Sequence, residues 1–331
     1  MSNLETRPRE TECGGSDVAA EPELLTPREV PLGGPRAMSV RRTLPHRERR
    51  MVGAWCFVDH YGPHDLSAAP GMDVPPHPHT GRATVSWLLE GEVLHRDSLG
   101  SEQMIAPGQL NHMTAGRGIA HSEQTPSAAE RTTQRLSGVQ LWVALPSGAR
   151  DEAPHFEHHA DLPVLESGGV RAQVVVGSVD GAASAAATYS PLVGADVTVA
   201  PGGSGRLPLD RSFEHAVLAM DGDVQVDGRG VRFGEMLYLP PGQSDVSVAH
   251  GTSSGPARAL LIGGEPFDEH IVMWWNFVGS DHDAIVRARA EWEAQDDRFG
   301  VVQGYDGPWL HAPALPNSRL KPRGRTRSHP Q

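Results

Sequence analysis

The sequence is poor in cysteine: only Cys13 and Cys56 occur among its 331 residues, so no disulfide framework is expected. Cys56 lies in the apolar run AWCFV, where it is expected to fill a core. The chain also lacks any stretch of about 18 uncharged apolar residues, and its first residues, MSNLETRPRETECGG, lack the apolar segment of a signal peptide. These absences favour a cytoplasmic protein without membrane contact.

Basic residues are outnumbered as well. The chain has 29 Lys and Arg against 41 Asp and Glu, a formal net charge of -12. This balance argues against direct binding to nucleic acid or to an anionic membrane, and it suits a neutral or weakly charged small ligand. Basic side chains do gather in the final stretch, NSRLKPRGRTRSHPQ, which we interpret as a solvated, disordered extension.

Glycine and proline, by contrast, are plentiful, with 37 and 28 residues. They separate short runs rich in Val, Leu and Thr, such as TVSWLLEGEVLH, GVQLWVALP and VRAQVVVG. This pattern predicts an all-β protein of the sandwich or barrel type. One helix is predicted in SDHDAIVRARAEWEAQDD, where Ser280 or Asp281 can cap the start and one face is formed by Ile285, Ala288, Arg289 and Trp292. This helix is expected to pack on the second of two domains.

A short internal similarity indicates two copies of one fold. LLEGEV at 88–93 resembles AMDGDV at 219–224, and APGQL at 106–110 resembles FGEML at 233–237. In each copy an acidic turn containing glycine joins two predicted strands, and a second turn containing glycine follows. The length of the chain is sufficient for two such cores.

Two pairs of ligand-type residues stand at strand positions i and i+2, so each pair points to one face of its strand. His77 and His79 form the first pair, in VPPHPHTG, and His121 and Glu123 form the second, in GIAHSEQ. An isolated HxH is more often polar decoration than a metal site. If the two strands are neighbours, however, three imidazoles and one carboxylate converge, a set that suits Fe(II), Mn(II), Ni(II), Co(II) or Zn(II). Four ligands leave an octahedral ion two open positions for O2 and a substrate, whereas a structural zinc site is closed and tetrahedral.

The remaining histidines are interpreted as structural or exposed. In the second half of the chain they stand singly, so no metal is expected there. The segment HFEHH at 155–159 is interpreted as a polar linker without a rigid face for a metal. These histidines are His60, His64 and His95 in the first half and His215, His250 and His270 in the second.

Three motifs together, HPHTG, LLEGEVLHRDSLG and PGQLNHMTAGRGIAHSE, closely resemble the pirin family, and the resemblance covers most of residues 28–296. It implies a bicupin, two tandem β-sandwich or jelly-roll barrels with a short C-terminal helix. The implied organisation is a disordered tail at 1–27, a metal-binding N-terminal cupin domain at 28–160, a metal-free C-terminal cupin domain at 161–298, and an extension at 299–331. Carried over by position, the metal ligands of the family fall on His77, His79, His121 and Glu123.

Two positions depart from the pattern. Ala83 stands where cupins often place a glutamate ligand, which leaves Glu123 as the only carboxylate of the site. His112 stands where pirins commonly carry a large apolar or aromatic residue. It either alters the wall of the pocket or is exposed at a strand end, and the second interpretation is favoured.

The resemblance also implies a function, because several pirins show quercetin 2,3-dioxygenase activity. The expected cofactor is one divalent metal ion, Fe(II) first, with Mn, Ni, Co or Zn as alternatives. The expected substrates are O2 and a flat flavonol, and Glu123 is expected to act as the catalytic base. Loose candidates for the wall of the ring slot are Phe57, Trp87, Met104 and Met113.

Two other functions stay open. Some pirins are regulators, so the chain could be a non-catalytic iron-binding protein that acts on transcription or on a partner enzyme. A zinc hydrolase is less favoured, because such sites usually have three protein ligands and water. We expect a monomer.

Overall fold

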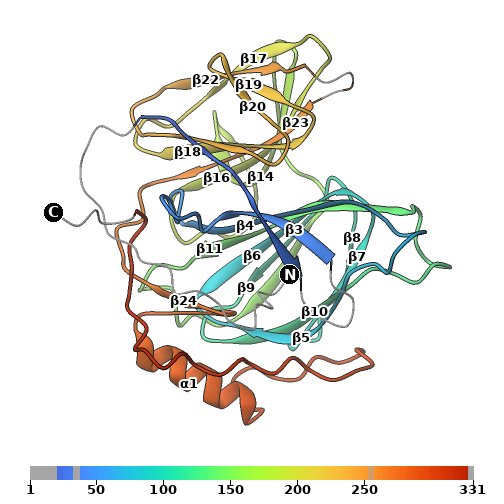
Figure 1. Ribbon diagram of the computed structural model, residues 1–331, viewed down its shortest axis with the longest axis vertical. Helices are drawn as coiled ribbons and strands as arrows, with labels where there is room; N and C mark the ends of the chain where they lie inside the picture. The colour runs from blue at the N-terminus through green and yellow to red at the C-terminus, as the bar shows by residue number, and fades with distance from the viewer. Residues whose placement is uncertain (1–20, 33–37, 253–254, 256, 327–331) are drawn as a thin grey trace.

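The computed structural model describes residues 21–32, 38–252, 255 and 257–326. These residues form 25 strands and one short helix, arranged as two β-barrels that lie one above the other in Figure 1. The all-β architecture and the two copies of one fold, both predicted from the sequence, are confirmed.

The first barrel packs a seven-stranded sheet on a four-stranded sheet. In spatial order, the larger sheet consists of β12 (His155–His159), β9 (Leu110–Thr114), β6 (Arg82–Glu90), β11 (Arg135–Ala144), β4 (Trp55–Asp65), β3 (Met38–Leu44) and β2 (Arg28–Leu32). The smaller sheet consists of β5 (Asp73–His79), β10 (Ile119–Gln124), β7 (Val93–Asp97) and β8 (Glu102–Ile105). Because β5 and β10 are neighbours, the two predicted ligand pairs lie on adjacent strands.

The second barrel repeats this plan. Its larger sheet consists of β1 (Glu23–Leu25), β21 (Met236–Leu239), β18 (Glu214–Asp221), β23 (Ala257–Gly264), β16 (Leu192–Val199), β14 (Val170–Val179) and β13 (Val164–Ser167), with β15 (Ala182–Ala183) beside β14. Its smaller sheet consists of β17 (Ser204–Pro208), β22 (Asp245–His250), β19 (Val224–Val226) and β20 (Arg229–Val231).

The N-terminal stretch crosses to this second barrel, since β1 pairs with β21. Leu25 is 2% exposed there and belongs to the apolar core. The prediction of a disordered tail is therefore wrong for residues 21–27, and the rest of that prediction, residues 1–20, lies outside the described residues.

The larger sheets of the two barrels share an apolar core. Buried side chains from β4, β6 and β11 pack against others from β18, β21 and β23. The indole nitrogen of Trp87 donates to the carboxylate of Asp196 at 3.0 Å, and that of Trp55 donates to the carbonyl oxygen of Val193 at 3.2 Å. The barrels are thus joined by buried contacts rather than by a linker alone.

The last part of the chain returns to the first barrel. It comprises β24 (Val272–Trp274), β25 (Phe277–Gly279) and α1 (His282–Glu293), and Figure 1 shows α1 beside β5 and β10, far from the second barrel. Asp281 caps the helix by accepting from the backbone N–H of Ala284 at 2.9 Å. Ala120 of β10 shares an apolar cluster with the buried face of α1. The helix was predicted correctly, but the expectation that it packs on the second barrel is wrong.

The chain beyond α1 is also packed rather than solvated. Leu320 is 2% exposed, and Arg323 is 5% exposed and forms a β-bridge with Ile271. The expectation of a disordered basic extension is therefore wrong up to residue 326, and residues 327–331 lie outside the described residues.

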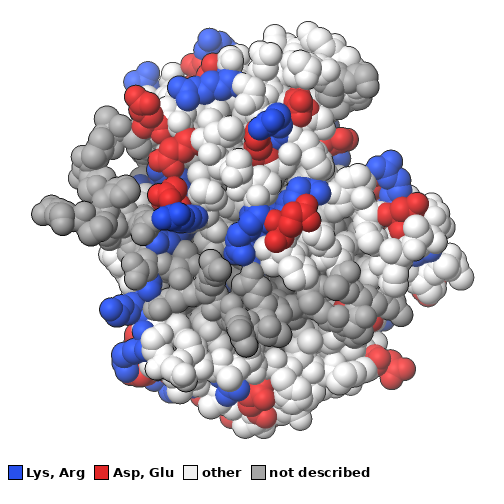
Figure 2. Space-filling model, viewed as in Figure 1, with Lys and Arg blue, Asp and Glu red and all other residues white. Residues whose placement is uncertain are grey.

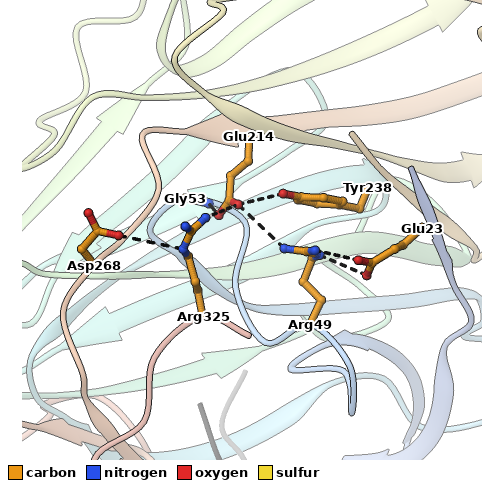
Figure 3. Close-up of polar contacts among 7 residues, drawn as sticks. All are labelled: Glu23, Arg49, Gly53, Glu214, Tyr238, Asp268 and Arg325. Carbon is orange, nitrogen blue, oxygen red and sulfur yellow. Dashed lines mark hydrogen bonds and ion pairs between the residues drawn. The ribbon is translucent and has the colours of Figure 1, made fainter. Parts of the chain in front are cut away.

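A buried ion cluster ties these segments together (Figure 3). Glu214 of β18 is fully buried and accepts from the backbone N–H of Gly53 at 2.6 Å, from the hydroxyl of Tyr238 at 3.0 Å and from Arg325 at 3.0 Å. Arg49, which stacks on the ring of Tyr238, lies 3.8 Å from the same carboxylate. One side chain thus links both barrels to the C-terminal segment.

Replacing Glu214 by alanine is expected to lower the free energy of unfolding by about 3 kcal/mol, because the partly buried guanidinium of Arg325 and the buried hydroxyl of Tyr238 lose their acceptor. Chemical denaturation measures this. The matched control is D268A, since Asp268 is exposed and its Oδ1 atom lies 3.9 Å from Nε of Arg325. A loss in E214A no greater than that in D268A would contradict a stabilising role.

The described residues include no helix with the length and apolar character needed to cross a membrane. On the face shown in Figure 2, basic and acidic side chains lie beside one another without forming one continuous basic patch among the described residues. The surface is consistent with the charge balance of the sequence.

Candidate metal centre

The predicted histidines meet in the first barrel. Strands β5 and β10 are antiparallel, and their register sets His121 opposite His77 and Ile119 opposite His79. One ring nitrogen from each of His77, His79 and His121 lies within 4.8 Å of the other two. The i and i+2 spacing on two neighbouring strands thus produces a cluster of three imidazoles.

Hydrogen bonds orient the three rings. The Nδ1 atom of His77 donates to the carbonyl oxygen of Pro75 at 2.8 Å, which leaves its buried Nε2 as an acceptor without a partner among the described residues. The Nε2 atoms of His79 and His121 lie 2.8 Å apart. Two nitrogens bound to one ion at about 2.1 Å lie roughly 3 Å apart, so this pair can share an ion. The third ring nitrogen, from His77, lies within 4.8 Å of both.

Burial keeps the rings neutral. His77, His79 and His121 are each at most 1% exposed. This burial lowers the pKa of all three imidazoles well below the ordinary value, because a charged ring loses its hydration. Neutral imidazole has the lone pair that a metal needs, and the donor set suits a divalent transition metal.

Glu123 lies next to this cluster. It is 3% exposed, and the hydroxyl of Ser86 lies 3.5 Å from its Oε1 atom. The register of β10 against β5 shifts beside Glu123, but the extra residue lies on β5, between Val74 and His77, so His121 and Glu123 keep the i and i+2 relation of a regular strand. The carboxylate is not among the ligand atoms that lie within 4.8 Å of one another. Its assignment as the fourth ligand stays a prediction.

His95 is a member of the site that the sequence analysis missed. It lies on β7, which pairs with β10, and it is 4% exposed, so of the two interpretations given above, structural or exposed, the second is excluded. Its Nδ1 lies 3.3 Å from Nδ1 of His121, and its Nε2 lies 3.2 Å from the carboxylate of Asp97. Burial by itself would raise the pKa of Asp97. The hydrogen bond from His95 lowers this pKa, and the net result is a pKa below the ordinary value. A charged carboxylate therefore orients His95, and His95 orients His121.

Substituting His95 by phenylalanine is expected to weaken metal binding 10- to 100-fold, roughly the effect of losing such an orienting hydrogen bond. The new ring can still stack on Phe156, which lies 4.4 Å from the His95 ring. The control, F156L, removes this stacking and keeps the hydrogen bond. Competition with a chelator of known affinity gives both constants, and equal affinities in H95F and wild type would refute this role.

Arg82 is a second unexpected neighbour. It begins β6, three residues after His79, and it is fully buried. One guanidinium nitrogen, Nη2, contacts Nδ1 of His79 and lies 3.3 Å from its Nε2. The guanidinium stacks 3.0 Å from the ring centre of Trp142. Only the fold shows that this arginine turns back onto the metal centre.

The returning C-terminal segment covers one end of the site. The carbonyl oxygen of Asn276 lies 3.4 Å from Nδ1 of His79, and the hydroxyl of Thr80 donates to the carbonyl of Val278 at 3.0 Å. The backbone N–H of Ala120 donates to the carbonyl of Phe299 at 3.1 Å. The site is therefore enclosed by residues nearly 200 positions away from its ligands in the sequence.

The loose candidates for a ring slot are placed mostly in cores. Phe57 stacks on Trp142 at 3.8 Å, and Trp87 faces the second barrel through its bond to Asp196. Met113 packs with Ala115 and Ile119 in a small buried cluster. Their burial at 0–1% exposure makes Phe57, Trp87 and Met113 supports of the barrel. Met104, on β8, is partly exposed.

His112 and the segment HFEHH were also misinterpreted. The segment is a strand, β12, which pairs with β9 and sets Glu157 opposite His112. His112 is 1% exposed rather than exposed at a strand end, and its Nδ1 donates to Glu157 at 3.0 Å. This hydrogen bond lowers the pKa of Glu157 to about 2, although burial of the carboxylate acts to raise it. A polar pair thus closes the edge of the sheet beside the site.

Comparison with known proteins identifies the family of this chain. Profiles of the families described as Pirin and Pirin C-terminal cupin domain match residues 37–143 and 194–300. A Pseudomonas aeruginosa protein is 42% identical over 88% of this chain and 90% of its own length. The chain belongs to the pirin family. The two barrels are its two cupin domains, and the arrangement is the bicupin that the sequence motifs implied.

Several relatives of this pirin carry informative names. The Pseudomonas aeruginosa relative is provisionally named a quercetin 2,3-dioxygenase, and a Caulobacter vibrioides relative, 41% identical over 77% of this chain and 88% of its own, is named pirin-like. A crystal structure of quercetin 2,3-dioxygenase from Acinetobacter baumannii has a TM-score of 0.84 at 40% identity, covering 91% of this chain and 98% of that one. The Escherichia coli pirin YhhW in complex with nickel(II) shares the fold, with a TM-score of 0.57 at 18% identity over 74% of this chain and 100% of its own.

Proposed function

We propose that this pirin is an iron(II)-dependent dioxygenase that opens the ring of a flavonol, in the manner of quercetin 2,3-dioxygenase. The observation that carries the proposal is the convergence of three neutral imidazoles beside a buried carboxylate. The names of two relatives that are at least 40% identical over about nine-tenths of the chain support it.

The residues fit one divalent ion held by His77, His79 and His121, with Glu123 as the fourth ligand. Nitrogen and oxygen donors suit Fe(II), and they also suit Mn(II), Ni(II), Co(II) and Zn(II). A bound iron(II) ion would supply the one-electron chemistry that makes O2 reactive toward the flavonol.

The chain itself would supply the base and the positioning. Glu123 takes the proton of the flavonol 3-hydroxyl, since a carboxylate beside three neutral imidazoles is the strongest candidate for an anionic acceptor. His95 and Asp97 hold His121 in place during this step. In the net reaction one flavonol and one O2 give one ring-opened ester and one molecule of carbon monoxide.

A protein loaded with Fe(II) under anaerobic conditions and then exposed to O2 and quercetin tests the proposal. We expect O2 uptake and carbon monoxide release in equal amounts, dependent on iron. Stoichiometric iron with neither O2 uptake nor carbon monoxide release across a set of flavonols would overturn it.

The enclosure of the site favours a second candidate, an iron-binding regulator. The four side chains are at most 3% exposed, and a flavonol needs an opening large enough for flat rings. In this alternative the charge of the bound ion alters a surface that a protein partner recognises. The same assay separates the two functions, because a regulator binds iron tightly without turnover.

A further inference from the structure

The second barrel contains a cavity of about 280 Å³ at one end of its interior. Residues of β14, β16, β17, β18 and β23 and of the segment that joins β17 to β18 form its wall. The volume lies near the lower limit of pockets that bind small molecules, roughly 300 Å³, and it suits a ligand with a single ring. The apolar part of the wall consists of Val179, Val193, Pro208, Leu209, Phe213 and Leu261.

This cavity lies at the end of the second barrel that corresponds to the metal end of the first. The internal similarity of the sequence is an offset of 131 positions, from residue 88 to residue 219. The same offset carries His77 and His79 onto Pro208 and Asp210, and β5 and β17 are each an end strand of a four-stranded sheet. The described residues place no group of three metal-ligating side chains around the cavity. Its occupant is therefore expected to be an organic molecule.

One buried polar side chain faces the cavity without a hydrogen-bond partner. His215 of β18 is 2% exposed and lines the cavity, and its ring centre lies 5.9 Å from that of Phe213. Neither of its ring nitrogens has a hydrogen-bond partner among the described residues. The register sets His215 opposite Gly263, where a Cβ atom would collide with the imidazole. The glycine therefore leaves room for the ring, and a ligand can supply the missing hydrogen bond.

Burial keeps this imidazole neutral. It lowers the pKa of His215 to about 4, although the nearby carboxylate of Asp210 acts to raise it. In either tautomer a neutral imidazole offers one acceptor nitrogen and one N–H donor. A buried polar group without a partner costs free energy, so a ligand that hydrogen-bonds to His215 gains affinity that a purely apolar ligand does not.

Two carboxylates lie at the mouth of the cavity. Asp180 and Asp210 line it and are exposed to solvent, and in the described part of the chain its wall contains no Lys or Arg. Asp210 accepts from the hydroxyl and from the backbone N–H of Ser212 at 2.6 and 2.8 Å, and these hydrogen bonds lower its pKa. The charge at the mouth is therefore negative at neutral pH, so it attracts a cation and repels an anion.

We propose that the second barrel binds a small organic amine, whose ammonium group faces Asp180, Asp210 and His215 and whose apolar body fills the cavity. The ammonium group donates hydrogen bonds to the carboxylates and to the acceptor nitrogen of His215. The apolar body, about one ring in size, packs against Phe213 and Leu261. This site is separate from the metal centre and does not depend on the proposed dioxygenase activity.

Three probes with the same phenyl ring and different charges test the proposal by calorimetry on the full-length protein. They are phenethylamine, the neutral 2-phenylethanol and the anionic phenylacetate. Phenethylamine is expected to bind with a Kd of about 1 mM or tighter. It should bind about fivefold more tightly than 2-phenylethanol, and phenylacetate should bind more weakly than either. No saturable binding of phenethylamine, or equal binding of the amine and the alcohol, would overturn the proposal.

Two variants separate the charge from the imidazole. D180N/D210N keeps the shape of both side chains, and it should reduce the affinity for the amine to that for the alcohol while the affinity for the alcohol stays unchanged. H215F keeps a ring against Gly263 and removes both nitrogens, so it should weaken both ligands about fivefold. The control is D223N, because Asp223 lies at the opposite end of β18 and accepts from the backbone N–H of Phe233 at 3.0 Å. An equal loss of amine affinity in D223N would show only a general attraction to an acidic protein and would overturn the proposal.

An amine can also be a metal ligand, so H121A, which is expected to lose the metal centre, locates the binding. H121A should bind phenethylamine as tightly as wild type. Loss of amine binding in H121A would assign the amine to the metal centre and overturn the second site. Amine binding that persists in H121A supports the second site even if the iron-dependent reaction is not found, so the two proposals fail separately.

A measurement on the wild-type protein covers the case in which a variant does not fold. NMR of methyl-labelled protein at saturating phenethylamine reports which methyl groups lie beside the phenyl ring. Intermolecular nuclear Overhauser effects are expected from the ring protons to the methyl groups of Val193 and Leu261, which line the cavity. Their absence in a saturated complex would contradict the proposed location.

Discussion

Alanine at position 121 is expected to abolish metal retention and turnover together. His121 contributes one of the three ring nitrogens of the centre and is hydrogen-bonded to both His79 and His95. Structural sites with four ligands bind zinc with roughly 10–16 kcal/mol, so one ligand accounts for about 3 kcal/mol, or about a hundredfold in affinity. The remaining imidazoles would also lose their orientation, and activity should fall to background.

Metal content and O2 uptake are measured on the same preparations of wild type and H121A. The matched control is H311A, because the His311 side chain is 71% exposed and is paired with Glu293 away from the centre. H311A should retain full iron and full activity. Stoichiometric iron in H121A after a chelator wash would show that the ligand set is wrong.

Glutamine at position 123 is expected to separate chemistry from binding. The change keeps the size of the side chain and removes its charge, so the fold and the contact with Ser86 should survive. Removal of a general base costs typically 10²- to 10⁴-fold in turnover. The three imidazoles still hold the ion, so metal affinity should fall much less than turnover.

The measurement is kcat at full metal loading, together with its dependence on pH. The part of the pH dependence of kcat that reflects deprotonation of the base should disappear in E123Q. It should return in E123D, which we expect to turn over more slowly than wild type. Full turnover by E123Q with metal bound would remove Glu123 from the proposed mechanism.

The sequence predicted those parts of the site that depend on a single strand. The alternation of a strand places His77 with His79 on one face, and the motif that contains His121 resembles a known family. The internal similarity between 88–93 and 219–224 also predicted the second barrel correctly. These signals are local, and they need no knowledge of which elements are neighbours.

The features that the sequence did not predict have one physical reason in common. Each of them depends on contacts between distant segments of the chain. His95 joins the site because β7 pairs with β10, and His112 is buried because β12 covers β9. The apolar face of α1 shows that the helix packs on something, but the sequence does not specify the first barrel. Leu320 and Arg323 lie in a polar, proline-rich stretch whose composition resembles disorder. Leu320 nevertheless packs in the apolar cluster beside α1, and Arg323 forms a β-bridge with Ile271.

Anomalous diffraction at the iron edge from crystals of the Fe(II)-loaded protein is the most direct test of the central claim. The account predicts one strong peak about 2 Å from a ring nitrogen of each of His77, His79 and His121, with a Glu123 oxygen at a similar distance. No peak at this position, or iron bound only elsewhere in the molecule, would contradict it.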